Sequence, residues 1–165
     1  EILDRYTIKN FIVPPVSNPA HSFSILQEKL KKGKISIRFL YTDDRINLKD
    51  THITFLWPEK QFVRDRTIQK KDSTTDIFDP IGDLNDFSQV FVFTDKKTKI
   101  LFTGDASPSV LGMVSKKFSE KSIISVYPDL IGVDILKVPH HGSKNGLTSD
   151  FLQLAAPTLS VISVG

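Results

Sequence analysis

The chain of 165 residues contains no cysteine, and this absence narrows its possible chemistry. Disulfide bonds, thiolate catalysis and every zinc site built on cysteine are excluded together. No apolar run approaches the roughly 18 residues that a membrane-spanning helix requires, so the sequence predicts no such helix. The surplus of positive charge is only +3, which is weak evidence for a polyanionic partner. A hydrophobic fraction of 39% is ordinary for a globular protein and argues against disorder.

Strand and helix patterns alternate along the chain, which indicates an α/β fold (α+β in some schemes) with mixed sheets and helices outside them. The length fits one domain, so residues 1–165 are taken as a single domain. Apolar and β-branched runs predict strands at Thr7–Val13, Ile35–Tyr41, Asp43–Leu48, Thr51–Trp57, Gln89–Thr94, Lys99–Thr103, Val133–Val138 and Leu159–Val164. Helical spacing predicts helices over Ser17–Gly33, Ser107–Glu120 and Thr148–Ala155. The charged stretch Glu59–Leu84 follows neither pattern and predicts a long surface loop.

An acidic residue, Asp105, follows the predicted strand Lys99–Thr103 directly after Gly104. A carboxylate at a strand end beside glycine lies at a sheet edge, where the backbone approaches a ligand closely. The alternative is that Asp105 caps the helix that begins at Ser107. Taken alone, the position of Asp105 is compatible with a ligand-binding carboxylate and with a helix cap.

Two adjacent histidines, His140 and His141, follow the predicted strand Val133–Val138. Successive side chains on an extended backbone point opposite ways, so one imidazole can face a site while the other flanks it. Neutral imidazole binds Zn, Mn or Fe, and the protonated ring donates to phosphate or to a leaving group. The amides of Gly142 and Ser143 would form a small concavity for an anion. The alternative is a pair of ordinary surface histidines.

Four further features accompany these two strand ends. A predicted helix separates the ends, so a single crossover can bring them to the same sheet edge, where sites of α/β proteins form. Lys137 lies inside the second strand, and because an unpaired buried lysine is costly, it either pairs with an acid or faces a polar cleft. Asn85 precedes the strand Gln89–Thr94, a place where polar residues are usually turn formers. The basic stretch Lys60–Lys71 is a candidate for contact with a phosphate backbone.

The segments ILFTGD (Ile100–Asp105), DILKVPHHGSKN (Asp134–Asn145) and ISVG (Ile162–Gly165) resemble a known family. They are similar to the C-terminal half of the metallo-β-lactamase-type domain of ComEC-type DNA-uptake competence proteins, and the resemblance covers essentially the whole chain. It implies a partial αββα sandwich with a metal site on the edge between two sheets. The HxHxDH-like motif that supplies the principal ligands in this family is absent from the 165 residues, which implies a fragment of a domain that begins upstream of residue 1.

The resemblance also implies roles for individual residues. Asp105 is expected to bridge two divalent ions, Zn or Mn, in the complete domain, and His141 to complete the second ion, although His140 and His141 can exchange roles. Asn85 stands where the family has a further ligand. The groups expected to act in catalysis, by offsetting charge on the phosphate or helping the leaving group, are His140, Lys137 and Ser143. Without the upstream ligands, the chain is expected to bind metal poorly and to be inactive alone.

The implied function is that of a metal-dependent phosphodiester hydrolase, a nuclease with DNA as its partner during uptake. One alternative is a hydrolase of the same fold that acts on a small phosphodiester or ester. The other is a degenerate domain that binds DNA or a protein without turnover. Proteins of the family are fused to a membrane protein or exported, so the resemblance implies an extracytoplasmic location, membrane-associated or free.

Overall fold

The computed structural model describes residues 2–69, 77–119, 132–144 and 146–164. The described helices are α1 (Ile2–Arg5), α2 (His21–Lys32), α3 (Lys60–Asp65), α4 (Pro108–Phe118) and α6 (Ser149–Ala155), with the 3-10 turns η1 (Leu84–Phe87) and η3 (Pro139–Gly142). The described strands are β1 (Asn10–Ile12), β2 (Ser36–Arg38), β3 (Arg45–Leu48), β4 (Thr51–Trp57), β5 (Thr67–Ile68), β6 (Asp79–Pro80), β7 (Val90–Asp95), β8 (Thr98–Phe102), β9 (Ile135–Lys137) and β10 (Leu159–Val161). Within these ranges, no helix has the length and apolar character needed to cross a membrane.

Six strands form the main sheet, in the order β10-β9-β8-β7-β4-β3. From β3 to β8 the neighbouring strands run antiparallel, whereas β9 runs parallel to both β8 and β10. The connections between the parallel strands contain α4 and α6, because parallel strands need a crossover. β1 and β2 form a separate parallel pair, and β5 and β6 form a short antiparallel pair.

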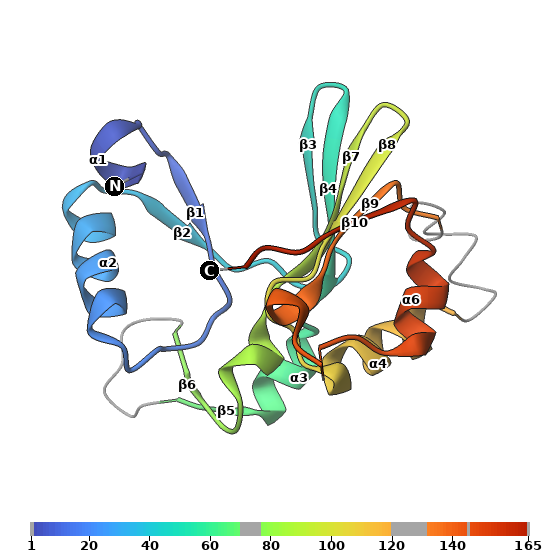
Figure 1. The fold of residues 1–165 in the computed structure, drawn as a ribbon. Coiled ribbons are helices and arrows are strands. Elements are labelled where there is room, and N and C mark those ends of the chain that lie inside the picture. The colour runs from blue at the N-terminus through green and yellow to red at the C-terminus, as the bar shows by residue number, and fades with distance from the viewer. Residues whose placement is uncertain (1, 70–76, 120–131, 145, 165) are drawn as a thin grey trace.

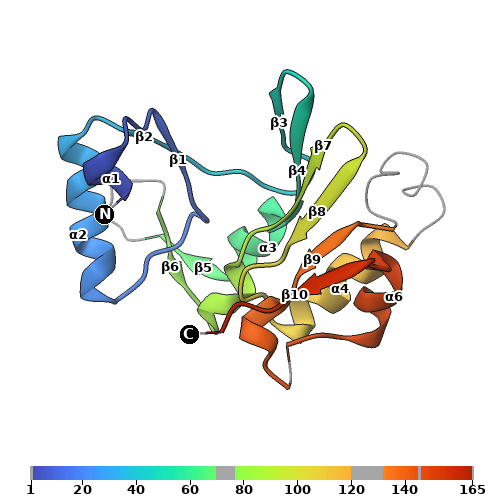
Figure 2. The same ribbon diagram turned by 45° about the horizontal axis from the view of Figure 1, so that its top comes forward.

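The elements lie in four layers (Figure 1). Helices α4 and α6 cover one face of the six-stranded sheet, and the β1–β2 pair lies on the other side of that sheet with α1 and α2 outside it. The rotated view shows the same order of layers (Figure 2). This arrangement is a partial αββα sandwich with mixed sheets and helices outside, so the predicted fold class is confirmed.

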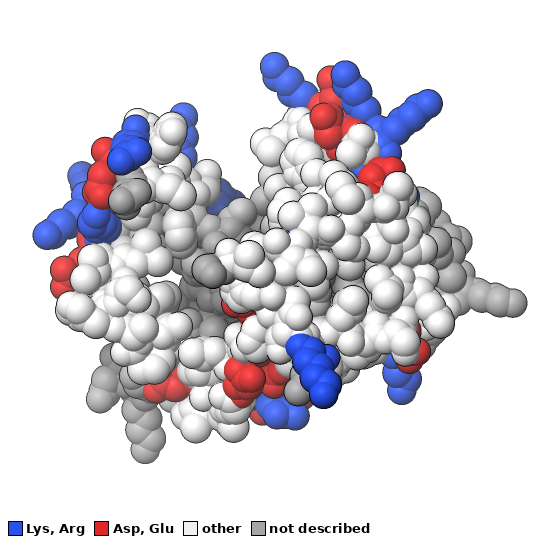
Figure 3. All heavy atoms as spheres, in the orientation of Figure 1, with Lys and Arg blue, Asp and Glu red and all other residues white. Residues whose placement is uncertain are grey.

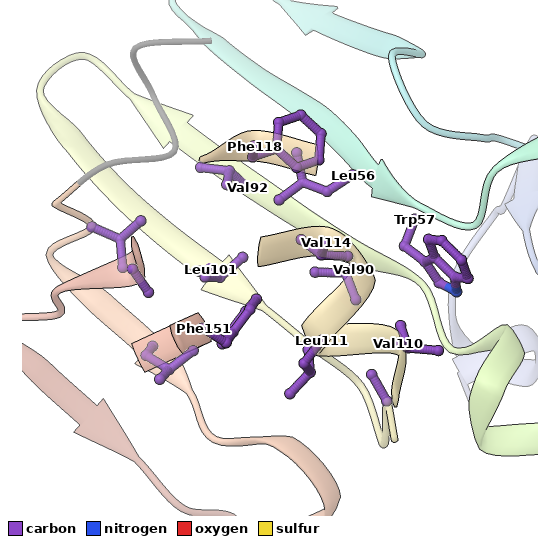
Figure 4. Packing of buried hydrophobic residues seen from close by; sticks show 14 residues of the cluster. Leu56, Trp57, Val90, Val92, Leu101, Val110, Leu111, Val114, Phe118 and Phe151 are labelled. Atoms are coloured by element: carbon purple, nitrogen blue, oxygen red, sulfur yellow. The ribbon is translucent and has the colours of Figure 1, made fainter. Parts of the chain in front are cut away.

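The main hydrophobic core lies between the sheet and α4, with α6 packed beside them (Figure 4). Alternate residues of β7 point into it, and Val90 and Val92 are therefore buried. The buried apolar residues of α4 recur at helical spacing, as predicted, and are Val110, Leu111, Val114 and Phe118. Leu101 of β8, Leu136 of β9 and Phe151 of α6 complete the contact. The core thus holds in place the parallel strands whose ends carry the polar residues.

The prediction of a surface loop over Glu59–Leu84 is wrong, because this stretch contains α3, β5 and β6. The structure differs from the prediction because two adjacent apolar residues, Phe62 and Val63, lie within this charged stretch. Val63 is buried, and the ring centroid of Phe62 lies 4.6 Å from that of Trp57 and 5.6 Å from that of Phe87. The buried Val63 and the half-buried Phe62 thus pack α3 against the protein, while Lys60 and Arg64 remain exposed.

Element boundaries also differ from the predictions. Helix α2 begins at His21 and not at Ser17, because the Asn18 side chain accepts a hydrogen bond from the Ala20 amide at 2.8 Å and keeps the preceding turn out of the helix. Strand β10 ends at Val161 and not at Val164. Residues 70–76, within the stretch predicted as a loop, and residue 120, the predicted end of α4, lie outside the described residues.

Candidate active site

The ends of β8, β9 and β10 lie beside one another at one edge of the main sheet (Figure 1). Phe102 of β8 and Val161 of β10 are both register partners of Lys137 in β9. Thr103, which is fully buried, joins the first two ends because its hydroxyl donates to the Lys137 carbonyl at 2.7 Å. The residues that follow these strands therefore emerge at a common edge, as predicted from the crossover.

Asp105 follows β8 through Gly104, whose backbone has a left-handed conformation with φ of 53°. A Cβ on Gly104 would lie 3.2 Å from the Cβ of Ser88, so glycine permits the close approach of the segment that precedes β7. The Lys137 ammonium donates to the Gly104 carbonyl at 2.8 Å and lies 3.6 Å from Asp105 Oδ1. Lys137 thus pairs with an acid, which is one of the two outcomes predicted for it.

The capping alternative for Asp105 is wrong, because Ser107 is the N-cap residue of α4. The Ser107 hydroxyl accepts a hydrogen bond from the Val110 amide at 3.3 Å and donates to Asp86 Oδ1 at 2.5 Å. The Asp105 carboxylate is 41% exposed and is directed to its neighbours at the sheet edge. Its position is therefore compatible with ligand binding, which stays a prediction.

The two histidines lie in the turn η3, which Val138 separates from the end of β9, and not on an extended strand end. His140 (φ 46°), His141 (φ 54°) and Gly142 (φ 74°) all have a left-handed backbone. Such a conformation is costly for residues other than glycine, and this kind of strain is concentrated at functional sites. The reasoning from alternation along an extended chain is therefore wrong, although the two imidazoles do have different surroundings.

The imidazole of His141 contacts a different group with each nitrogen. Nδ1 lies 2.8 Å from the Ser163 carbonyl oxygen, and Nε2 lies 3.6 Å from Asp105 Oδ1. Because a carbonyl oxygen only accepts, Nδ1 carries the hydrogen of this bond. In the neutral ring, Nε2 then has a lone pair on the side of the Asp105 carboxylate. Metal-binding histidines are oriented in the same way, with the second ring nitrogen bonded to a carbonyl or carboxylate.

Gly142 places the histidine turn against the segment that follows β10. A Cβ on Gly142 would lie 3.0 Å from Ile162 Cγ2, next to the Ser163 carbonyl that orients His141. We expect Gly142→Ala to lower the free energy of unfolding by about 1–2 kcal/mol in urea denaturation, because of this contact and the left-handed backbone. The control is Gly112→Ala in α4, where a Cβ meets nothing within 4 Å and stability should rise by about 0.5–1 kcal/mol. Equal losses in the two variants would contradict the argument.

His140 and Ser143 are exposed next to His141, and no hydrogen bond of their side chains is found among the described residues. The predicted anion-binding concavity is wrong for Ser143, whose amide donates to the His140 carbonyl at 2.9 Å and is therefore occupied. The two side chains are open to a bound molecule. Their predicted catalytic roles stay predictions.

Asn85 lies in η1, directly before β7, at the same edge of the sheet. It is half-buried, and together with Ser88 and Pro14 it lines a cavity of about 230 Å³. No hydrogen bond joins its side chain to Asp105 or His141 in the part of the chain that is described. The structure therefore places Asn85 at the same edge as the pair without a hydrogen bond to it among the described residues, and its role as a metal ligand stays a prediction.

Asp86 is a residue near the site to which the sequence analysis assigned no role. Its carboxylate accepts from Ser107, and its carbonyl accepts from Trp57 Nε1 at 2.7 Å, so one residue joins η1 to α4 and to β4. The sequence shows Asp86 only as an acidic residue in the polar segment before β7, where it cannot be distinguished from a residue that forms a turn.

Asp105 and His141 fit part of a coordination sphere for a divalent ion. Two ligand atoms at tetrahedral zinc, each about 2.1 Å from the ion, lie about 3.4 Å apart. The observed separation between Asp105 Oδ1 and His141 Nε2 is 3.6 Å. No group of three or more His, Cys, Asp and Glu side chains that could hold a metal ion is found among the described residues. These residues therefore provide two ligands, fewer than the four of a typical zinc site.

The family match and the similarity to a curated relative agree with the resemblance drawn from the motifs. The family described as the metallo-beta-lactamase superfamily matches residues 10–165. ComE operon protein 3 of Bacillus subtilis (strain 168), a ComEC-type protein, is 27% identical over 166 residues, which are 99% of this chain and 18% of that protein. The crystal structure of the metallo-beta-lactamase fold protein YhfI from Bacillus subtilis aligns over 87% of this chain and 51% of that chain, with 14% identity and a TM-score of 0.33.

Proposed function

Because the chain belongs to the metallo-beta-lactamase superfamily, we propose that it contributes part of the active site of a metal-dependent phosphodiester hydrolase. Members of this superfamily are generally hydrolases and typically use divalent metals. We propose DNA as the substrate and nuclease action during DNA uptake as the role. The similarity to a ComEC-type relative supports this choice, although the chain spans only 18% of that relative.

The observation that carries the proposal is the meeting of Asp105, His141 and Lys137 at one sheet edge, with Asp105 Oδ1 at 3.6 Å from both nitrogen atoms. Asp105 and His141 are the residues that would hold the ion. A divalent ion bound there would supply Lewis-acid chemistry and activate water for attack on phosphorus. The Ser163 carbonyl orients the His141 ring, so Nε2 stays on the side of the carboxylate.

Positive charge for the phosphate is available from Lys137, whose side chain is 22% exposed. One hydrogen of its ammonium is used by the Gly104 carbonyl, and two others remain for Asp105 or for a phosphate oxygen. A fixed ammonium in a partly buried position stabilises negative charge that develops during hydrolysis. The exposed His140 ring, next to His141, is the group proposed to donate a proton to the leaving oxygen, and the Ser143 hydroxyl is proposed to bind a phosphate oxygen.

We propose that the remaining ligands come from an HxHxDH-like segment upstream of Glu1, with Asn85 as a further ligand, in a protein that acts outside the cytoplasm. The test uses the polypeptide that includes this segment. We expect it to cleave labelled DNA with Mn²⁺ or Zn²⁺ present, and we expect cleavage to stop with EDTA and to return when the metal is restored in excess. Cleavage that continues in EDTA would overturn the proposal.

The same assay separates the alternative functions. The small ester bis(p-nitrophenyl) phosphate should be hydrolysed more slowly than DNA, because it cannot use contacts to a polymer backbone. A clear preference for the small ester would favour a small-molecule hydrolase. Metal binding without hydrolysis of either substrate would favour a domain that binds without turnover.

A further inference from the structure

A cavity of about 340 Å³, formed by Tyr41, α3, β5 and Phe78, is lined by none of the residues of the candidate active site. Its apolar walls are the half-buried rings of Tyr41 and Phe78 and the buried side chain of Val63. Lys60 and Arg64 of α3 complete it with two exposed basic side chains. The cavity thus combines aromatic surface with positive charge and is referred to below as the Tyr41 pocket.

The walls of the Tyr41 pocket are held by hydrogen bonds of the backbone, two of them between distant parts of the chain. The Ser17 amide donates to the Phe78 carbonyl at 2.8 Å, and the Phe78 amide donates to the Pro15 carbonyl at 3.0 Å. The Tyr41 amide donates to Asp44 Oδ2 at 2.8 Å. Because these bonds hold the backbones of both aromatic residues, the pocket is formed in the structure without a bound molecule, which lowers the cost of binding.

The charge of the Tyr41 pocket is not neutralised by the described residues. Neither Lys60 nor Arg64 forms an ion pair within the described ranges. They are four residues apart on α3 and therefore project from the same side of the helix. The Lys60 ammonium lies over the Tyr41 ring, 5.4 Å from its centre, so a positive charge and an aromatic ring lie side by side in the pocket. The pocket is therefore suited to a molecule with a flat ring and a nearby anionic group.

A nucleotide unit of single-stranded DNA has both of these properties. Its base can stack on an aromatic side chain, and its phosphates pair with lysine and arginine. In a duplex, the base faces are covered by their neighbours and cannot stack in this way. The proposed activity on DNA makes a strand the molecule that the protein would meet, so the inference rests on the proposed function.

We propose that the Tyr41 pocket is a subsite for single-stranded DNA, where a base stacks on Tyr41 and the adjacent phosphates pair with Lys60 and Arg64. The pocket is connected to the candidate active site through a small core. Phe62 of α3 packs on Phe87 of η1 at 5.6 Å, and η1 leads to Ser88, which lies against Gly104. The subsite and the edge with Asp105 and His141 are therefore joined through packed side chains, so we expect a strand held at one to have a defined position relative to the other.

The test measures binding of a fluorescein-labelled oligothymidylate by fluorescence anisotropy in EDTA, with the 165-residue chain. The double variant Lys60→Gln/Arg64→Gln should bind more weakly, and the slope of log affinity against log salt should fall by about 1.4, or about 0.7 for each lost phosphate contact. The control is Lys49→Gln/Lys96→Gln, which removes the same charge at the tips of the β3–β4 and β7–β8 hairpins. Lys and Arg side chains also gather at these tips (Figure 3), and this control should leave the slope unchanged.

The aromatic contact is tested separately from the charge. Tyr41→Leu keeps an apolar side chain without a ring and should weaken binding roughly 5- to 150-fold, the range for loss of one stacked base. Tyr41→Phe keeps the ring and should bind like the original protein. Thermal unfolding by circular dichroism identifies a Tyr41→Leu chain that has lost its fold. The charge variants on α3 are on the surface and keep the test decisive in that case.

Several results would overturn the subsite. Examples are no binding of the oligothymidylate, equal effects of the α3 pair and the hairpin-tip pair, unchanged binding by Tyr41→Leu, or equally tight binding of a duplex of the same length. Since EDTA prevents metal-dependent cleavage, the experiment reports binding alone. Binding of the oligothymidylate in the Tyr41 pocket by a protein that does not cleave DNA would refute only the catalytic part of the proposed function. Cleavage of DNA by a protein whose Tyr41 pocket does not bind the oligothymidylate would refute only this inference.

Discussion

Replacement of Asp105 by alanine is expected to lower metal-dependent DNA cleavage by at least about a hundredfold, in a polypeptide that includes the proposed upstream segment. The lower bound follows from the tenfold to hundredfold losses seen when only an outer partner of a metal ligand is removed. The Asp105 carboxylate lies next to both His141 and Lys137, because its Oδ1 is 3.6 Å from His141 Nε2 and 3.6 Å from Lys137 Nζ. Without the carboxylate, two nitrogen groups remain at the edge with no anionic ligand between them.

Matched controls separate this effect from a general loss of charge or of imidazole. Asp50→Ala removes an exposed carboxylate from the turn between β3 and β4 and should leave cleavage unchanged. His141→Ala should lower cleavage strongly, whereas His21→Ala, at the exposed start of α2, should not. Asp105→Asn keeps the shape but removes the charge, and it should be nearly as inactive as Asp105→Ala. Cleavage by Asp105→Ala at the rate of Asp50→Ala would contradict the role of this residue.

The second large effect concerns two neighbours in β9. Leu136 is fully buried against the main core, whereas Lys137 points to the opposite face of the strand. Leu136→Ala is expected to lower the free energy of unfolding by about 2–5 kcal/mol, the usual cost of truncating a buried leucine. Lys137→Met removes one hydrogen bond to the Gly104 carbonyl and should lower the free energy of unfolding by about 1 kcal/mol.

For DNA cleavage we expect the opposite order, with a larger loss in Lys137→Met than in Leu136→Ala. Cleavage by folded Lys137→Met should fall roughly a hundredfold or more, because a fixed charge is lost beside the phosphate. Leu136→Ala should cleave at close to the original rate at temperatures where it is folded. Urea denaturation and cleavage rates at a low temperature measure both quantities. A Leu136→Ala chain that is stable, or a Lys137→Met chain that is fully active, would contradict this division between core and site.

The meeting of Asp105 and His141 could be predicted from the sequence because it depends on topology. Two strands joined by a helix run parallel, and the carboxyl ends of parallel strands lie at one edge. The prediction needed only the strand patterns before Gly104 and before Pro139, together with the polar residues after them. The paired Lys137 could be predicted in the same way, from the cost of leaving a buried ammonium without a partner.

Other parts of the site depend on contacts between distant residues and could not be predicted. The left-handed backbone of His140 and His141 is stabilised by the turn that the Ser143 amide closes on the His140 carbonyl. The bond from His141 to the Ser163 carbonyl joins segments 22 residues apart, and its backbone acceptor is not distinguished by any side chain. Helix α3 was missed because two apolar residues, Phe62 and Val63, bury one side of an otherwise charged helix.

The central claim is that Asp105 and His141 together hold a divalent ion. Anomalous X-ray diffraction from crystals of the polypeptide with the upstream segment, grown with Mn²⁺ or Zn²⁺ and measured at the absorption edge of the metal, tests this claim directly. The expected result is a peak about 2.0–2.2 Å from both Asp105 Oδ1 and His141 Nε2. Peaks elsewhere in the protein and none at this pair, in crystals where the metal is present, would contradict it.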